Sequence, residues 1–144
     1  MNPQLFCKTV LTKITTITSY VDTSKVAYYK SLVKEMSVMK PMGLLKPDSL
    51  CYVSAKCHAV SSGERGYTGH GRTAECQKTD HARGECCQYG LTDPLGIIVV
   101  LLVDQDIESL GHRNTCLGSR YTKMSPAMAP HKKYGNNTVM DFYR

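Results

Sequence analysis

The chain has 144 residues, of which 42% are hydrophobic and 21% charged, an ordinary composition for one globular domain with a sizeable core. Its net charge of +6 is spread along the sequence without a run of five like charges, which argues against a nucleic-acid-binding arm. The longest apolar run, 97–103, is far shorter than a membrane span, so we expect no transmembrane segment.

The N-terminal segment 1–21 is rich in threonine, and its pattern does not distinguish a strand from a tail. It carries Lys8 and Lys13 and lacks the apolar core of a signal peptide. Seven cysteines, none in a Cys-x-x-Cys motif, indicate an oxidising compartment, one to three disulfides and at least one thiol left free or intermolecular. We therefore expect a secreted, periplasmic or cell-surface protein whose signal is not visible in this chain, with its folded domain at 22–144.

Two helices are predicted in the first half of that domain. Helical spacing of apolar residues predicts the first over 22–39. Asp48 is expected to cap a second helix over 48–61, which stops at Ser61-Ser62-Gly63. The glycine-rich stretch 63–84 is expected to be a long loop, and long loops in compact domains are often functional.

The second half predicts one more helix and three strands. Asp93-Pro94 is a helix start, with proline at the first helical position, so we expect the apolar run to form a nearly buried helix that reaches about Asp106. Pro126 favours an edge strand, and a turn is expected at 135–137. The three predicted strands cover 85–89, 121–129 and 137–143.

Cysteine positions predict one disulfide more readily than others. Cys76 lies in the long loop, ten residues before Cys86, and a bridge from this loop to the strand at Cys86-Cys87 is expected. Cys51 and Cys57 are six residues apart on one predicted helix and do not share a face well enough to pair.

Three motifs each place a glycine before a residue with chemical potential: Gly69-His70, Gly84-Glu85 and Gly111-His112-Arg113. Glycine lets the backbone turn sharply, so we expect the two histidines and the glutamate to converge on one polar cleft. Imidazole and carboxylate groups are common ligands of Zn²⁺ and its neighbours. By contrast, His58 lies on an otherwise apolar helix, and we interpret it as a half-buried histidine with satisfied hydrogen bonds.

The order of these motifs resembles the CAP superfamily, which includes cysteine-rich secretory proteins, antigen five and plant pathogenesis-related proteins. A helix with Ala-Lys-Cys-His-Ala (55–59) precedes Gly-His and Gly-Glu. An apolar helix with an acid near its end, Gly-His-Arg and two closing strands follow. The resemblance covers about 25–143 and looks closest to the compact bacterial, SCP-like branch, in which Gly-His-Arg precedes an apolar turn like 114–117.

The resemblance implies an α+β fold, namely a three-layer α-β-α sandwich with a central antiparallel sheet. It also implies a cleft of two histidines and two acids, in which His70 and His112 would hold Zn²⁺ or another divalent metal. Cys86 stands where family members usually have asparagine after Gly-Glu, and the second acid is aspartate rather than glutamate. The cleft residues that match are His70, Glu85, Asp104 and His112, with Arg113 beside the last.

We therefore expect an exported bacterial CAP-like binding domain rather than an enzyme, with an extracellular or envelope ligand that is a lipid, a peptide or a glycan. The first alternative is a metal-dependent, peptidase-like hydrolase, in which metal-bound water is the nucleophile and Glu85 or Asp104 the base. The second alternative is a disulfide-stabilised protein-interaction scaffold whose histidine cluster is structural.

Overall fold

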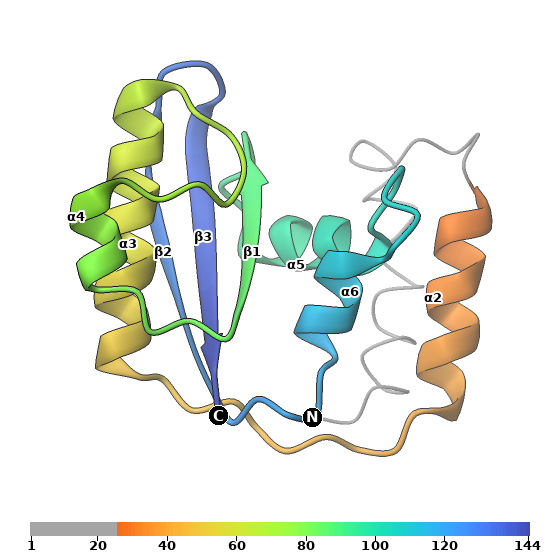
Figure 1. Ribbon diagram of the computed structural model, residues 1–144. Coiled ribbons are helices and arrows are strands. Elements are labelled where there is room, and N and C mark those ends of the chain that lie inside the picture. Colours follow the sequence, from red (N-terminus) through yellow and green to blue (C-terminus); the bar gives the residue numbers. More distant parts are fainter. Residues whose placement is uncertain (1–25) are drawn as a thin grey trace. The chain divides into compact units, whose positions relative to one another are not determined.

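The computed structural model describes residues 26–144, which Figure 1 shows as helices and strands. They form an α+β protein with a three-stranded antiparallel sheet, so the α+β part of the predicted fold class is confirmed. The prediction for 1–21 and the first residues of the helix predicted at 22–39 lie outside the described residues.

The chain divides into two compact units. The helical unit contains residues 26–44 and Asp93–Leu117, and the sheet unit contains Leu45–Thr92 and Gly118–Arg144.

The helical unit consists of α2 (Val26–Val38), α5 (Pro94–Val103) and α6 (Gly111–Cys116). Asp93 caps α5 as predicted, because its carboxylate accepts the Gly96 N–H at 2.7 Å. Among the described residues, no helix has the length and apolar character needed to cross a membrane. The core of this unit consists of buried apolar side chains from α2 and α5: Leu32, Met36, Val99, Leu102 and Val103.

The sheet unit is built from two helices and three strands. They are α3 (Ser49–Arg65), α4 (Ala74–Lys78), β1 (Gly84–Tyr89), β2 (Lys123–His131) and β3 (Gly135–Tyr143). The strand order is β1-β3-β2 and both pairings are antiparallel, so β3 is central and β2 is an edge strand, where its prolines are tolerated. In Figure 1, α3 runs alongside β2 and β3.

The contact between α3 and the sheet is made by small side chains. Short residues let the helix axis approach the strands closely, and the buried cluster is completed by Cys87 and Val139. The small members of this cluster are Ala55 and Ala59 from α3, and Ala127 and Ala129 from β2.

The predicted end of α3 at Ser61-Ser62-Gly63 is wrong, because the helix continues to Arg65 and ends at Gly66, which has φ 65°. The Ser62 hydroxyl donates to the His58 carbonyl at 2.6 Å, so this serine is accommodated inside the helix. Gly63 is required by packing, because a Cβ atom there would lie 2.0 Å from the Pro130 carbonyl oxygen.

Two further local predictions are corrected. The stretch 63–84 is not one continuous loop, since it includes the end of α3 and all of α4, whose N-cap is Thr73. The turn before β3 lies at 132–134 rather than 135–137. It closes early because the His131 Nδ1 atom accepts the N–H groups of Lys133 and Tyr134.

Candidate metal centre and the pocket beside it

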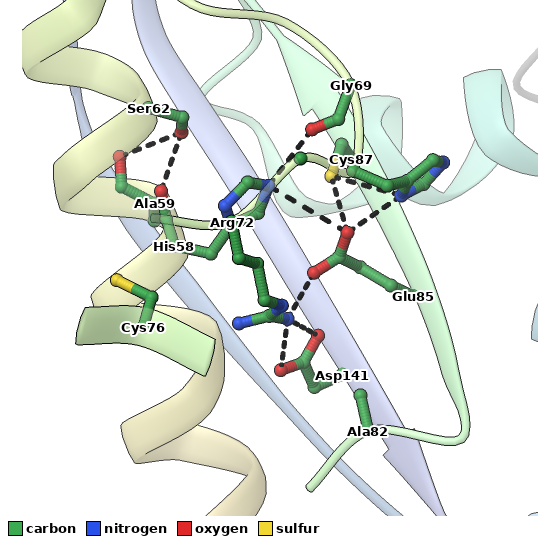
Figure 2. A network of polar contacts seen from close by, with 12 residues as sticks. His58, Ala59, Ser62, Gly69, Arg72, Cys76, Ala82, Glu85, Cys87 and Asp141 are labelled. Carbon is green, nitrogen blue, oxygen red and sulfur yellow. Dashed lines mark hydrogen bonds and ion pairs between the residues drawn. The ribbon is translucent and has the colours of Figure 1, made fainter. Parts of the chain in front are cut away.

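Three side chains with metal-ligating atoms meet between α3 and β1 in the sheet unit. His58 comes from α3, whereas Glu85 and Cys87 come from β1 and share one face, because they are two residues apart in a strand. Their donor atoms all lie within 4.8 Å of one another. Figure 2 shows the His58 ring and the Cys87 sulfur directed toward the Glu85 carboxylate. We call these three residues the donor cluster.

The Glu85 Oε1 atom lies at the centre of this arrangement. It is 3.5 Å from the Cys87 Sγ atom and 3.8 Å from the His58 Nε2 atom. His70 approaches the same oxygen from the solvent side: its Nδ1–H donates at 2.7 Å, while 60% of its side chain is exposed. The donor cluster therefore has a buried side at His58 and an open side at His70.

His58 is fully buried, so the interpretation as a half-buried, satisfied histidine is wrong. Its Nε2–H donates to the Gly69 carbonyl at 2.9 Å. Gly69 has φ 104°, a conformation that favours glycine. The His58 Nδ1 atom has no hydrogen-bond partner among the described residues. Buried polar atoms are almost always paired, and an orphan indicates strain, a functional role or a missing ion or water.

Arg72 balances the charge below the donor cluster. Its guanidinium pairs with the second oxygen of Glu85 and, at 2.9 Å, with the Asp141 carboxylate (Figure 2). The β1–β3 register places Glu85 directly opposite Asp141, so two buried acids share one cation. Ser54 on α3 completes the network, because its hydroxyl donates to Asp141 and its carbonyl accepts from Arg72.

The surroundings shift the pKa values of these groups in different directions. Burial alone would raise the pKa of Glu85, but the hydrogen bond from His70 and the charge of Arg72 hold it below its usual range. The hydrogen bond to Glu85 raises the pKa of His70, and burial lowers that of His58. Burial strongly raises the pKa of the Cys87 thiol. Without a bound cation, Glu85 is therefore ionised at neutral pH and Cys87 is a thiol.

An open pocket of about 370 Å³ adjoins the donor cluster. Four of its six lining residues have charged or polar side chains, which include both the exposed imidazole and the ionised carboxylate described above. The lining residues are His70, Arg72, Asp80, Ala82, Gly84 and Glu85.

The other predicted site residues gather in the helical unit. Asp104 follows α5 in a left-handed conformation with φ 54° and is almost fully buried. Its Oδ1 atom accepts the His112 Nδ1–H at 2.7 Å. Its Oδ2 atom accepts the backbone N–H groups of His112 and Arg113, at the start of α6. Asp104 therefore serves α6 as a capping acid and orients the His112 ring.

Arg113 is buried and its guanidinium is occupied by structural contacts. It donates to the carbonyl groups of Leu102, Val103 and Tyr28 at 2.7–3.0 Å. It also reaches the Ser31 hydroxyl at 2.9 Å, so it connects all three helices of the helical unit. Two of these carbonyl groups, those of Leu102 and Val103, lie at the C-terminus of α5, where a helix leaves carbonyls unpaired.

The predicted site residues thus form two contacting pairs. His70 lies against Glu85 in the sheet unit, and Asp104 lies against His112 in the helical unit. A single cleft that contains all four residues remains a prediction. The residues that sequence reasoning missed are His58 and Cys87 as candidate ligands, together with Arg72 and Asp141.

The structure contains a disulfide between Cys57 and Cys76, which joins α3 to α4. The predicted bridge from Cys76 to the strand at 86–87 is therefore wrong. Cys57 faces the loop that carries α4, whereas Cys87 faces the opposite side of α3, in the core with Ala55 and Ala59.

Comparisons of the chain with protein-family models, curated proteins and solved structures found no match.

Proposed function

We propose that this chain is an exported CAP-like binding domain, with the layered α-β-α arrangement of that family, and that it recognises its ligand through a metal ion held in the sheet unit. The observation that carries the proposal is the donor cluster of His58, Glu85 and Cys87 beside an open polar pocket. Export is proposed from the cysteine content and the Cys57–Cys76 disulfide, since such bonds persist mainly in oxidising compartments.

The spacing of the donor cluster fits a tetrahedral zinc ion. With Zn–S bonds of about 2.3 Å and Zn–N or Zn–O bonds of about 2.0–2.1 Å, neighbouring ligand atoms lie roughly 3.3–3.6 Å apart. The distances from Glu85 Oε1 to Cys87 Sγ and His58 Nε2 are 3.5 and 3.8 Å. Coordination also requires the His58 Nε2 atom to turn from the Gly69 carbonyl, its present hydrogen-bond partner, toward the metal ion. Three protein ligands leave a fourth position for water or a ligand atom.

His70 fits the role of an outer partner rather than a fourth ligand. Its Nδ1 atom lies 2.7 Å from Glu85 Oε1, which is hydrogen-bond distance and too short for two ligands of one zinc ion. A hydrogen bond to a ligating carboxylate orients that ligand and tunes the metal. Because the His70 side chain is largely exposed, it also presents a donor to whatever occupies the pocket.

Metal binding at this site should release protons, and the number released can be measured. Coordination requires a Cys87 thiolate and a proton-free His58 Nε2 atom. The His58 Nδ1 atom has no hydrogen-bond partner among the described residues, so it can take the proton that leaves Nε2. The net release is therefore about one proton per metal ion, from the thiol.

A bound metal ion would supply a Lewis acid for an anionic or carbonyl oxygen of the ligand. Hydrolysis is the weaker reading, because a general base works best with a pKa near the operating pH. The Glu85 pKa lies below its usual range, and both of its oxygens are engaged by His70 and Arg72. These contacts favour binding over proton abstraction.

The test is zinc calorimetry at neutral pH on the metal-free chain with its disulfide intact. We expect tight binding to wild type, no measurable binding to Cys87→Ala and a roughly 10–100-fold loss in His70→Ala. His81→Ala, which changes an exposed histidine outside the cluster, is the matched control and should bind as wild type does. Unchanged affinity in Cys87→Ala would contradict the proposed site. Peptide or ester hydrolysis by the zinc-loaded chain would favour the hydrolase.

A further inference from the structure

A second pocket, of about 440 Å³, lies elsewhere in the sheet unit and is lined entirely by basic and aromatic residues. The proposed metal centre does not include this pocket. It is formed where the chain enters β1 and β2 and where β3 ends, so it sits at one end of the sheet. The lining residues are Arg83, Arg120, Tyr121, Tyr143 and Arg144.

We call this second pocket the arginine pocket. Its floor is held in place by the core. Tyr121 is only 5% exposed and packs against Phe142, with ring centroids 5.4 Å apart. Its hydroxyl donates to the Arg83 carbonyl at 3.0 Å, which ties the segment before β1 to the segment before β2. The Tyr121 ring is therefore fixed in the core.

The guanidinium groups are oriented by the two tyrosine rings. The Arg120 Cζ atom lies 4.8 Å from the centroid of the Tyr121 ring, and the Arg83 Cζ atom lies 5.9 Å from that of Tyr143. Cation–π stacking of this kind uses the face of the guanidinium and leaves its N–H edge available for hydrogen bonds.

The guanidinium groups of Arg83 and Arg120 are not paired with acidic side chains in the part of the chain that the structure describes. Both are exposed, unlike the buried and fully paired Arg72. The nearby Lys123 is paired with Asp48 at 3.2 Å, so the arginines are the charges left to act on a ligand.

We propose that the arginine pocket binds the phosphate or sulfate group of an ester whose organic part packs against the Tyr143 ring. Guanidinium groups form bidentate, charge-assisted hydrogen bonds with tetrahedral oxyanions, and the core-held Tyr121 ring supports the Arg120 guanidinium. The half-buried Tyr143 ring provides apolar area for a ring or a sugar face.

The test is calorimetric titration of the metal-free chain with phenyl phosphate, phenyl sulfate and inorganic phosphate, with phenol as the uncharged control. We expect one site for the esters, weaker binding of inorganic phosphate, none of phenol, and affinities that fall with added salt. The ratio of the two ester affinities identifies which oxyanion the pocket prefers. Failure of both esters to bind at millimolar concentration would overturn the proposal.

Three variants test whether the esters bind in the arginine pocket. Arg83→Gln/Arg120→Gln should weaken ester binding by about tenfold or more, since it removes charged hydrogen-bond donors from exposed positions. Tyr143→Leu should reduce the preference for phenyl phosphate over inorganic phosphate. Arg65→Gln changes another exposed arginine that stacks on a tyrosine, 4.9 Å from the Tyr67 centroid, and should bind as wild type does. Equal ester affinity in wild type and the double variant would contradict the assignment, whatever the outcome of the zinc titration.

Discussion

At the scale of single residues, the sheet unit depends on one arginine between two acids. The Arg72 side chain is only 6% exposed and pairs with Glu85 and Asp141, which are 10% and 0% exposed. Burial raises the pKa of Asp141 to about 6, although the Ser54 hydrogen bond and the Arg72 charge oppose this shift. The Glu85 carboxylate of the donor cluster stays ionised because His70 donates a hydrogen bond to it and the Arg72 cation lies beside it.

Replacing this arginine should destabilise the fold strongly. Arg72→Ala leaves two buried carboxylates without a cation, and breaking a buried ion pair in this way costs about 3–5 kcal/mol. Denaturant unfolding at neutral pH measures the loss. Lys78→Ala, which removes an exposed pair with Glu75, is the control and should change stability by less than about 1 kcal/mol. A loss for Arg72→Ala as small as that of the control would contradict the network.

The two histidines near Glu85 should titrate on opposite sides of their ordinary value of 6.5. The hydrogen bond to Glu85 raises the pKa of His70, so its stabilising effect is complete below pH 6.5 and is lost as the pH rises through the raised pKa. Burial lowers the pKa of His58, so the neutral ring stabilises the fold above pH 6.5 and this effect is lost as the pH falls through the lowered pKa.

NMR titration of the metal-free chain measures both values, and His70→Gln identifies the His70 signal. A His70 midpoint at or below 6.5 would count against its hydrogen bond to Glu85, and a His58 midpoint above 6.5 would count against the burial of that ring.

At the scale of elements, the position of α3 determines the donor cluster. The helix carries His58 on the face that packs its alanines against β2 and β3, and the disulfide from Cys57 ties α4 to it. A displacement of α3 from the sheet would separate His58 from Glu85. The close approach near the helix C-terminus, where Gly63 meets Pro130, maintains this spacing.

Gly63→Ala tests that approach. Alanine raises helix propensity, but its Cβ atom would lie 2.0 Å from the Pro130 carbonyl oxygen, so backbone must move. We expect a net loss of about 1–3 kcal/mol in thermal or denaturant unfolding, the usual cost of overpacking. Gly43→Ala, where a Cβ atom would have no neighbour within 4 Å, should stay within about 0.5 kcal/mol of wild type. Stabilisation by Gly63→Ala would show that α3 and β2 are not in such close contact.

Most elements were predictable because their signals are local. Asp48 and Asp93 accept the N-terminal N–H groups of their helices as expected, and Pro126 lies in an edge strand. The end of α3 had a local signal in Gly66, but Gly63 imitated an earlier stop, since its packing against the Pro130 carbonyl is not visible in the sequence. The turn before β3 was not predictable, because it depends on the His131 ring.

The residues of the candidate site likewise divide into those that the sequence indicates and those that it does not. The Gly-His and Gly-Glu motifs lead to His70 and Glu85, which are in contact. The i, i+2 spacing in a predicted strand was a usable signal that Cys87 shares the Glu85 face. No local pattern could indicate His58, Arg72 or Asp141, because their roles require the position of α3 on the sheet and the β1–β3 register.

At the scale of the whole molecule, both proposed binding sites belong to the sheet unit. The donor cluster and the arginine pocket use residues from Leu45–Thr92 and Gly118–Arg144, whereas the helical unit holds His112 by an internal contact with Asp104. The family resemblance predicts a metal held jointly by His70 and His112. The donor cluster predicts instead a metal that requires Cys87 and is indifferent to His112.

Cobalt(II) binding followed by absorption spectroscopy distinguishes these two sites most directly, because only a thiolate ligand produces a sulfur-to-cobalt charge-transfer band. We expect this band in wild type and in His112→Ala, with equal affinity, and its loss in Cys87→Ser. Cobalt bound without the band in wild type, or a band that survives in Cys87→Ser, would contradict the donor cluster. Loss of binding in His112→Ala would instead place the metal in a cleft shared with the helical unit.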